Sequence, residues 1–274
     1  MSTIEAIVLG IVQGLTEFLP VSSSAHLRIV PALVGWNDPG AGFTAVIQLG
    51  TVAAVVIYFW SDLWRITLAW FTSLLHKEKR SDPDARMGWY LIVATIPIAI
   101  IGFALKDQIE TGARNLWLIA TALIVGGLVL WWADRVGARR KEIPDLTTKD
   151  GVTIGLAQSL ALIPGVSRSG STISAGLFLG YTREEAARFS FLLSVPAVVL
   201  SGLFQLKDVG TGHGPGAVPT AIATLVSFGV GYLAIAWFLK YLTNHSTLLF
   251  VIYRVAMGVL LIGLLAAGTI SATH

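Results

Sequence analysis

The chain has 274 residues, of which 54% are hydrophobic and only 13% are charged, and it contains no cysteine. The absence of cysteine excludes disulfide bonds, thiolate metal sites and cysteine nucleophiles. The formal net charge of +3 is small, gives no support to nucleic-acid binding, and leaves membrane lipids as the expected surroundings of so apolar a chain.

The apolar residues are gathered into runs that predict membrane helices. Crossing the hydrocarbon core of a bilayer takes about 20 consecutive apolar residues. Six runs have this length and predict full transmembrane helices at 43–60, 88–105, 115–133, 186–206, 217–239 and 248–270. Four shorter pieces, bounded by proline, glycine or a charge, predict broken or re-entrant helices at 3–17, 20–35, 151–163 and 170–181. We therefore predict an all-α integral membrane protein with six full spans and two broken re-entrant hairpins.

Two of the broken segments share one pattern. In Gly10–His26 an apolar run ends at a proline and a serine-rich stretch follows, and a similar arrangement returns at Gly155–Gly170. We refer to residues 20–26 and 164–170 as the first and second polar loops. The repeat divides the chain into 1–140 and 150–274, each half being one broken hairpin followed by three spans. Because a duplicated unit with an odd number of crossings must sit in opposite orientations, we predict an inverted-topology repeat forming a single membrane domain.

The basic residues predict how this domain is oriented. Thirteen of the nineteen Lys and Arg residues fall in loops that the topology places on one side, against Lys106, Arg114 and Lys207 on the other. By the positive-inside rule, the loops 61–87 and 134–150 are cytoplasmic, and the first hairpin enters the membrane from the outer face.

The first polar loop and the helix before it carry candidate catalytic side chains. Gln13 and Glu17 are spaced i and i+4, which places their side chains about 6 Å apart on one helix face. This pair could hold a divalent cation, Mg²⁺ or Ca²⁺, or could pack as a polar face against another helix. After Pro20, the serines at 22 to 24 suit a helix N-cap. Ser23 and His26 are spaced i and i+3, close enough for the imidazole to take the serine proton. The alternative is a histidine that serves as a structural hydrogen-bond donor.

The second polar loop has the chemistry of a phosphate site. Arg168 stands among hydroxyl groups, and its guanidinium matches two phosphate oxygens. The surrounding hydroxyl residues are Ser167, Ser169, Ser171 and Thr172. The alternative is an arginine that caps the carbonyls of a broken helix.

Three further polar residues lie in or beside apolar segments. Arg254, in the last span, is either a second phosphate ligand or the ion-pair partner of Glu17 or Asp150. Gln48 and Gln158 are single amides, which we expect to hydrogen-bond backbone at the breaks and not to contact a substrate.

These motifs strongly resemble a known family over the full length of the chain. The segments Gly14–Ser23 with His26, and Pro164–Gly170 followed by Thr172, resemble the undecaprenyl-diphosphate phosphatase family, also called bacitracin-resistance proteins. The segments Phe189–Pro196 and Tyr253–Arg254 agree with it as well.

The resemblance implies an enzyme of the bacterial cytoplasmic (inner) membrane. It would hydrolyse a polyprenyl diphosphate to the monophosphate, recycling the lipid carrier of cell-wall synthesis, at a site facing the periplasm or the outside. By motif position, the functional residues would be Glu17, Ser23, His26 and Arg168, supported by Ser22, Ser167 and Thr172. Gln13 stands where the family often has a second glutamate, and Ala25 replaces a frequent glycine.

The sequence leaves several alternatives open. The expected mechanism is attack by Ser23 with His26 as base, but attack by water or by His26 itself is also compatible with these residues. A transporter or flippase for a lipid phosphate is the alternative function, because inverted repeats with broken helices are typical of alternating access. The sequence does not choose between a monomer and a homodimer.

Overall fold

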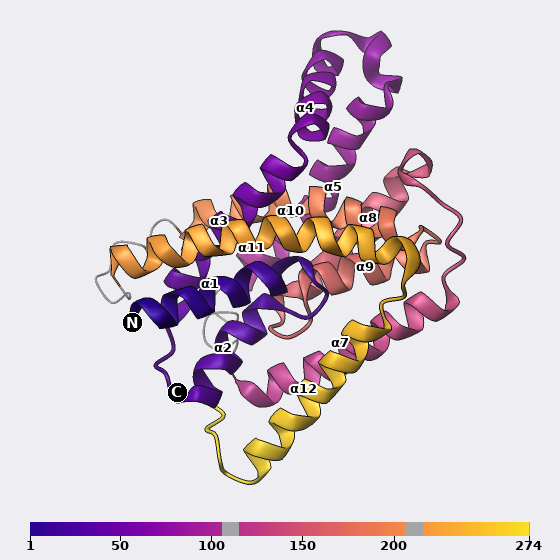
Figure 1. Ribbon diagram of the computed structural model, residues 1–274. Helices are drawn as coiled ribbons and strands as arrows, with labels where there is room; N and C mark the ends of the chain where they lie inside the picture. The colour runs from indigo at the N-terminus through magenta and orange to yellow at the C-terminus, as the bar shows by residue number, and fades with distance from the viewer. Residues whose placement is uncertain (106–114, 206–215, 274) are drawn as a thin grey trace.

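The computed structural model describes residues 1–105, 115–205 and 216–273, and they form an all-helical protein (Figure 1). The first half holds α1 (Thr3–Phe18), α2 (Ser23–Val34), α3 (Gly40–Tyr58), α4 (Trp60–Leu75), α5 (Pro83–Ala104) and α7 (Leu116–Val136). The second half holds α8 (Thr148–Ser159), α9 (Arg168–Phe178), α10 (Arg183–Gln205), α11 (Ala217–Asn244) and α12 (Leu248–Ala266). Short 3-10 turns lie at Lys77–Ser81, Ile143–Asp145 and Leu160–Leu162. Extended pairing in the described ranges is limited to one bridge between Lys141 and Tyr181.

The long helices agree only in part with the six predicted spans. Helices α5, α7, α11 and α12 are long and apolar enough to cross a membrane. Helices α3 and α4 pass that test only as a pair, because the chain bends by 80° between them. Within the described ranges this gives four candidate spans, or five if the bent pair is one span.

Two predicted spans account for the difference. The run 43–60 ends at the bend between α3 and α4, where Phe59 separates the two helices. The run 186–206 lies largely in α10, which opens with the charged residues Arg183, Glu184 and Glu185 and is not among the candidate spans. The orientation predicted from the basic residues places three of them on the opposite side of the membrane, namely Lys106, Arg114 and Lys207. All three lie outside the described residues.

The surface of the helices suits a lipid environment. Phe103, Leu225 and Leu233 are 69, 71 and 67% exposed. Soluble proteins rarely expose many large apolar side chains of this kind, whereas hydrocarbon solvates them well. Together with the candidate spans, this surface identifies a multi-pass membrane protein.

A row of phenylalanines joins the two halves of the chain. Phe18 of α1 meets Phe191 of α10 with ring centroids 5.3 Å apart, and Phe191 meets Phe238 of α11 at 6.0 Å. Phe238 in turn meets Phe250 of α12 at 5.1 Å. Because Phe18 lies one residue after Glu17, this aromatic core fixes the end of α1 that carries the carboxylate.

The two short helices that precede the polar loops pack in corresponding ways. Helix α1 lies along α11, and α8 lies along α5 (Figure 1). A Cβ atom added at Gly10 would lie 2.6 Å from the Ala223 carbonyl oxygen, and one added at Gly155 would lie 2.5 Å from the Ala94 carbonyl oxygen. Glycine at these two equivalent positions therefore permits close backbone approach, as is common between membrane helices.

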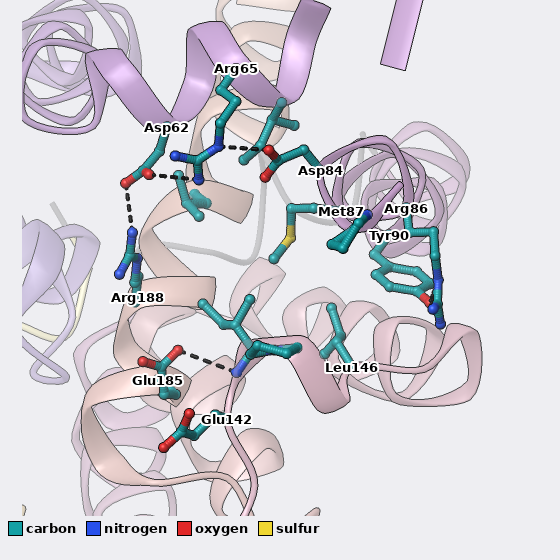
Figure 2. Close-up of a pocket in the computed structure, with 15 residues that line it drawn as sticks. Asp62, Arg65, Asp84, Arg86, Met87, Tyr90, Glu142, Leu146, Glu185 and Arg188 are labelled. Carbon is teal, nitrogen blue, oxygen red and sulfur yellow. Dashed lines mark hydrogen bonds and ion pairs between the residues drawn. The ribbon is translucent and has the colours of Figure 1, made fainter. Parts of the chain in front are cut away.

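Residues from the basic segments that were predicted to share one side lie around one cavity, with Asp62, Glu142 and Arg188 in its lining. Arg65 pairs with Asp84 at 2.6 Å and with Asp62 at 3.2 Å, and Arg188 pairs with Asp62 at 2.7 Å (Figure 2). These ion pairs border a cavity of about 400 Å³, which is also lined by Glu142. None of the candidate catalytic residues lines this cavity.

Candidate active site

The two polar loops have the same local structure. Ser22 and Ser167, the residues before α2 and α9, have φ angles of 77° and 75°. Each hydroxyl accepts a bond from the backbone N–H three residues on, at Ala25 and Gly170 respectively. Non-glycine residues rarely adopt positive φ, at a cost of about 1–3 kcal/mol each. Such strain is typical of functional sites, and here it turns the chain so that the next residue enters the site.

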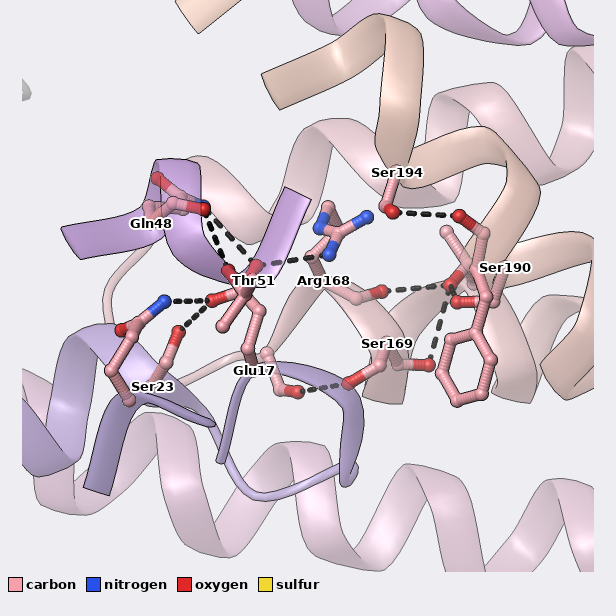
Figure 3. A network of polar contacts seen from close by, with 12 residues as sticks. Glu17, Ser23, Gln48, Thr51, Arg168, Ser169, Ser190 and Ser194 are labelled. Atoms are coloured by element: carbon pink, nitrogen blue, oxygen red, sulfur yellow. Dashed lines mark hydrogen bonds and ion pairs between the residues drawn. The ribbon is translucent and has the colours of Figure 1, made fainter. Parts of the chain in front are cut away.

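Glu17 is the centre of the network that these turns create (Figure 3). Its side chain is buried, and its Oε2 accepts bonds from Gln13 Nε2 at 2.9 Å and from Ser23 Oγ at 2.6 Å. Its Oε1 accepts bonds from Gln48 Nε2 at 3.1 Å and from Arg168 Nη2 at 2.9 Å. Burying a carboxylate is costly unless it is paired and hydrogen-bonded, and these four donors meet that requirement.

Two polar atoms at this centre are buried without a hydrogen-bond partner within the described structure. They are Nη1 of Arg168, a donor, and Oε1 of Gln13, an acceptor. A buried donor or acceptor left unpaired costs about 1–3 kcal/mol. A ligand with negatively charged oxygens would satisfy Arg168, and a hard cation would satisfy Gln13.

The hydroxyl groups of Ser169 and Thr172 bond to other groups of the protein. Ser169 donates to the carbonyl of Leu19 at 3.0 Å, which ties the second loop to the first. Thr172 Oγ1 lies 2.8 Å from the Arg168 carbonyl and 2.6 Å from Ser190 Oγ on α10. The side chains of Ser169 and Thr172 are almost fully buried, and they hold the backbone of Arg168 in place.

Arg254 is not the ion-pair partner of Glu17 or Asp150, which was one of the two alternatives that the sequence suggested. Its guanidinium is fully buried and donates to backbone carbonyls, with no bond to Glu17 or Asp150. The five acceptors are the carbonyls of Pro20, Ala122, Leu123, Gly165 and Val166. Pro20 and Gly165 hold equivalent positions in the two loops, and Ala122 and Leu123 belong to α7. Arg254 therefore bonds both loops and α7 at once. This correction follows from burial, because a charge at this depth needs all its donors satisfied by the protein.

His26 does not form the predicted pair with Ser23. Its Nδ1 lies 2.7 Å from the carbonyl oxygen of Ser22, and its Nε2 lies 2.6 Å from the hydroxyl of Tyr253. Ser23 instead donates to Glu17. The i, i+3 spacing brought the two residues onto one helical turn, but the tertiary partners turned the imidazole toward α12.

Gln48 contacts Glu17 and Tyr253 contacts His26, and neither contact was predicted from the sequence. Gln48 was expected to hydrogen-bond backbone, yet its amide contacts the central carboxylate. The sequence did contain an indication of this contact, since a lone amide in an apolar run needs a buried hydrogen-bond partner. Gln158, for which the same role was expected, does donate to a backbone carbonyl, that of Ala94 at 3.3 Å.

The residues present offer a partial metal site. Across the described residues there is no cluster of three or more His, Cys, Asp or Glu side chains that could hold a metal ion. Glu17 and the unpartnered Oε1 of Gln13 nevertheless provide oxygen atoms of the kind that Mg²⁺ and Ca²⁺ prefer. Mg²⁺ is often held by one or two carboxylates together with substrate phosphates, so this pair fits a cation that is bound along with a phosphorylated ligand.

The fold and the site together define a multi-pass helical membrane protein with a buried acid and arginine centre, where the loop after α1 meets the loop before α9. The family model for bacitracin resistance protein BacA matches residues 6–260. The chain belongs to this family.

The curated relatives are similar over nearly their whole length. One, undecaprenyl-diphosphatase from Nocardioides sp., is 57% identical over 270 residues, covering 98% of each chain. Another, undecaprenyl-diphosphatase 2 from Streptomyces avermitilis, is 54% identical over 283 residues, covering 99% of this chain and 97% of its own. Undecaprenyl-diphosphatase from Paenarthrobacter aurescens is 54% identical over 277 residues, covering 99% of this chain and all of its own.

Proposed function

We propose that this protein is an undecaprenyl-diphosphatase, which hydrolyses undecaprenyl diphosphate to the monophosphate and phosphate. The observation that carries the proposal is the buried centre where Arg168, with one unpartnered donor atom, meets Glu17 and Ser23. The names of the relatives, at more than 50% identity, support the same reaction and not the transport of a lipid phosphate. The physiological consequences would be recycling of the cell-wall lipid carrier and resistance to bacitracin.

Arg168 would bind the terminal phosphate of the substrate. In the ligand-free arrangement, Nη2 is paired with Glu17 while Nη1 has no partner within the described structure. A phosphate would engage Nη1 first and then compete with the carboxylate for Nη2, giving the two-point contact that a planar guanidinium favours. Charge that develops on the phosphoryl oxygens would be stabilised by this fixed cation.

Ser23 is the nucleophile in this proposal, and Glu17 takes the place of His26 as its base. The serine Oγ lies 2.6 Å from Oε2 of Glu17, so its proton can pass directly to the carboxylate as Oγ attacks the terminal phosphorus. The bond between that phosphorus and the bridging oxygen breaks, which releases the lipid monophosphate. Water then hydrolyses the phosphoserine, which releases inorganic phosphate, and Glu17 returns its proton so that the serine hydroxyl and the carboxylate are both restored.

A divalent cation, Mg²⁺ or Ca²⁺, would be held by Glu17 and Gln13. Bound there with the diphosphate, it would neutralise charge on the phosphate oxygens. The fit rests on the unpartnered Oε1 of Gln13 beside the carboxylate.

The inverted repeat of residues 1–140 and 150–274 is part of the same proposal. It is supported by the matching loops, by Arg254 contacting the equivalent carbonyls of Pro20 and Gly165, and by the corresponding packing of α1 on α11 and of α8 on α5. The proposal counts α3 and α10 as the fifth and sixth crossings, with α4 in the cytoplasmic loop that follows α3.

The orientation follows from the basic loops. We infer that Arg65 and Arg188, which meet at Asp62, mark the cytoplasmic end in a bacterial inner membrane. The active site would then open toward the periplasm or outside. A homodimer is the oligomeric state proposed for testing, by measuring the mass of the protein in detergent.

Purified protein in detergent tests the function directly. Undecaprenyl diphosphate is supplied with Mg²⁺, and released phosphate is measured for the wild type, for Arg168→Lys and for a control, Arg140→Lys. Arg140 bonds Gly180, which lies beyond the end of α9 opposite to Arg168. Release by the wild type and the control but not by Arg168→Lys supports the proposal. No release by well-folded wild-type protein would refute it.

A further inference from the structure

Tyr253 makes a hydrogen bond to His26 that takes no part in the proposed reaction. It lies on α12 and is 40% exposed, and its hydroxyl oxygen lies 2.6 Å from Nε2 of His26. The two rings are nearly parallel, with centroids 5.5 Å apart and an interplanar angle of 16°. His26 is only 4% exposed.

The hydrogen bond at Nδ1 identifies the tautomer of the His26 imidazole. Nδ1 lies 2.7 Å from the Ser22 carbonyl oxygen, which can only accept, so Nδ1 carries a hydrogen. In the neutral ring Nε2 then has the lone pair, and the Tyr253 hydroxyl donates to it. Both ring nitrogens are therefore engaged by partners other than Ser23.

The carbonyl oxygen that accepts the hydrogen bond from His26 Nδ1 belongs to Ser22, a residue with a strained backbone conformation. Ser22 has a φ of 77°, and its carbonyl accepts bonds both from the ring Nδ1 and from the backbone N–H of His26 at 3.2 Å. The next residue is Ser23, whose hydroxyl reaches Glu17. A strained turn persists only where its surroundings hold it, and the imidazole is one of the groups that do so.

We propose that Tyr253 is a positioning residue, which holds the His26 ring on the Ser22 carbonyl and thereby fixes the peptide that presents Ser23 to Glu17. This proposal rests on the proposed function, because the consequence is an effect on turnover. It makes His26 a support for the nucleophile. Tyr253 acts only through that ring.

Substitutions at position 26 separate support from base catalysis. An asparagine places its side-chain N–H close to the position of Nδ1, so His26→Asn can still donate to the Ser22 carbonyl. His26→Gln carries its amide farther out, near Nε2, and cannot. We expect His26→Asn to retain on the order of a tenth of the wild-type kcat, and His26→Gln and His26→Ala to lose about 10²-fold or more. Equal inactivity of all three variants would overturn the supporting role.

A double-mutant cycle tests whether Tyr253 works through His26. Tyr253→Phe keeps the stacked ring and removes only the hydroxyl, and we expect kcat to fall about 10-fold with KM within about 2-fold of the wild type. In a His26→Asn background the same change should have no further effect, because the hydroxyl has lost its partner. An equal loss in both backgrounds would mean that Tyr253 only packs α12, which contradicts the proposal. The matched control is Tyr232→Phe on α11, where the phenol ring packs against Tyr58.

A spectroscopic measurement makes the test independent of turnover. In protein labelled with ¹⁵N-histidine, the His26 signals are assigned by their loss in His26→Asn. We expect the Nε2 resonance to shift in Tyr253→Phe while Nδ1 remains protonated. An unchanged Nε2 resonance would refute the contact even if the wild type released no phosphate, so failure of this inference is distinguishable from failure of the proposed function.

Discussion

Ser23 and Arg168 occupy equivalent positions in the two polar loops, and each donates to a different oxygen of the same carboxylate. Both are the first residue of a helix that follows a serine with positive φ. Ser23 Oγ reaches Oε2 of Glu17 at 2.6 Å, and Arg168 Nη2 reaches Oε1 at 2.9 Å. One structural device, used twice, therefore presents a hydroxyl from one side and a guanidinium from the other.

Arg168→Lys should lose most activity although the charge is kept. A point ammonium cannot reproduce a two-point contact with a phosphoryl group. We expect kcat/KM to fall about 10²-fold or more, equivalent to about 3 kcal/mol of transition-state stabilisation. Phosphate release from the lipid diphosphate measures this. Near-normal turnover would remove Arg168 from the site.

Glu17→Gln should change the metal dependence far more than Gln13→Ala does. The carboxylate supplies the charge that attracts a divalent cation, whereas the amide supplies only one neutral oxygen. Because Glu17→Gln also removes the base of Ser23, we expect it to keep only a trace of activity, and that activity to need a much higher Mg²⁺ or Ca²⁺ concentration for its half-maximum. Gln13→Glu should be active. Titration of metal into chelator-treated protein gives the midpoints. A full rate with an unchanged midpoint in Glu17→Gln would show that the cation binds elsewhere.

Ser23→Ala should abolish turnover while the lipid still binds, because Arg168 carries the phosphate contact. Ser23→Cys should keep a trace of activity through its thiolate. Acid-quenched reactions with labelled substrate, followed by peptide mapping, locate any phosphoryl-enzyme. Wild-type turnover in Ser23→Ala would exclude serine attack, and phosphate trapped on His26 would make the histidine the nucleophile.

Gly126→Ala should destabilise the protein by about 1–3 kcal/mol, as overpacking of a fixed core does. A Cβ atom at this position would overlap Nη2 of Arg254, which cannot move away without giving up its carbonyl acceptors. Thermal unfolding in detergent measures the loss, and turnover should fall with it because both loops shift. Gly229→Ala on α11 is the control, since an added Cβ there meets nothing within 4 Å. Equal stability of the two variants would contradict the role given to Arg254.

Cysteines introduced at Ser81 and Thr148 should be protected from an impermeant thiol reagent in intact cells, whereas one at Thr273 should react. The natural lack of cysteine removes any background labelling. A cysteine at Gly212, which lies outside the described residues, should react as well. Labelling at Ser81 without permeabilisation would reverse the orientation and the outward-facing site.

The sequence by itself determined the local features of this protein. Helix periodicity placed Gln13 and Glu17 on one face, and the hydrogen bond of 2.9 Å between their side chains confirms it. The short helices and the serine cap after the first break were also predicted, because capping and helix termination depend on neighbouring residues.

Only the tertiary structure decided the longer connections. Arg168 and Glu17 are 151 positions apart, and His26 and Tyr253 are 227 positions apart. No local propensity encodes which carbonyls Arg254 meets, that Gln48 reaches the carboxylate, or that the chain bends by 80° after Tyr58. These contacts arise where helices from both halves pack around buried charges, and each donor bonds to the acceptors that the finished packing brings within reach.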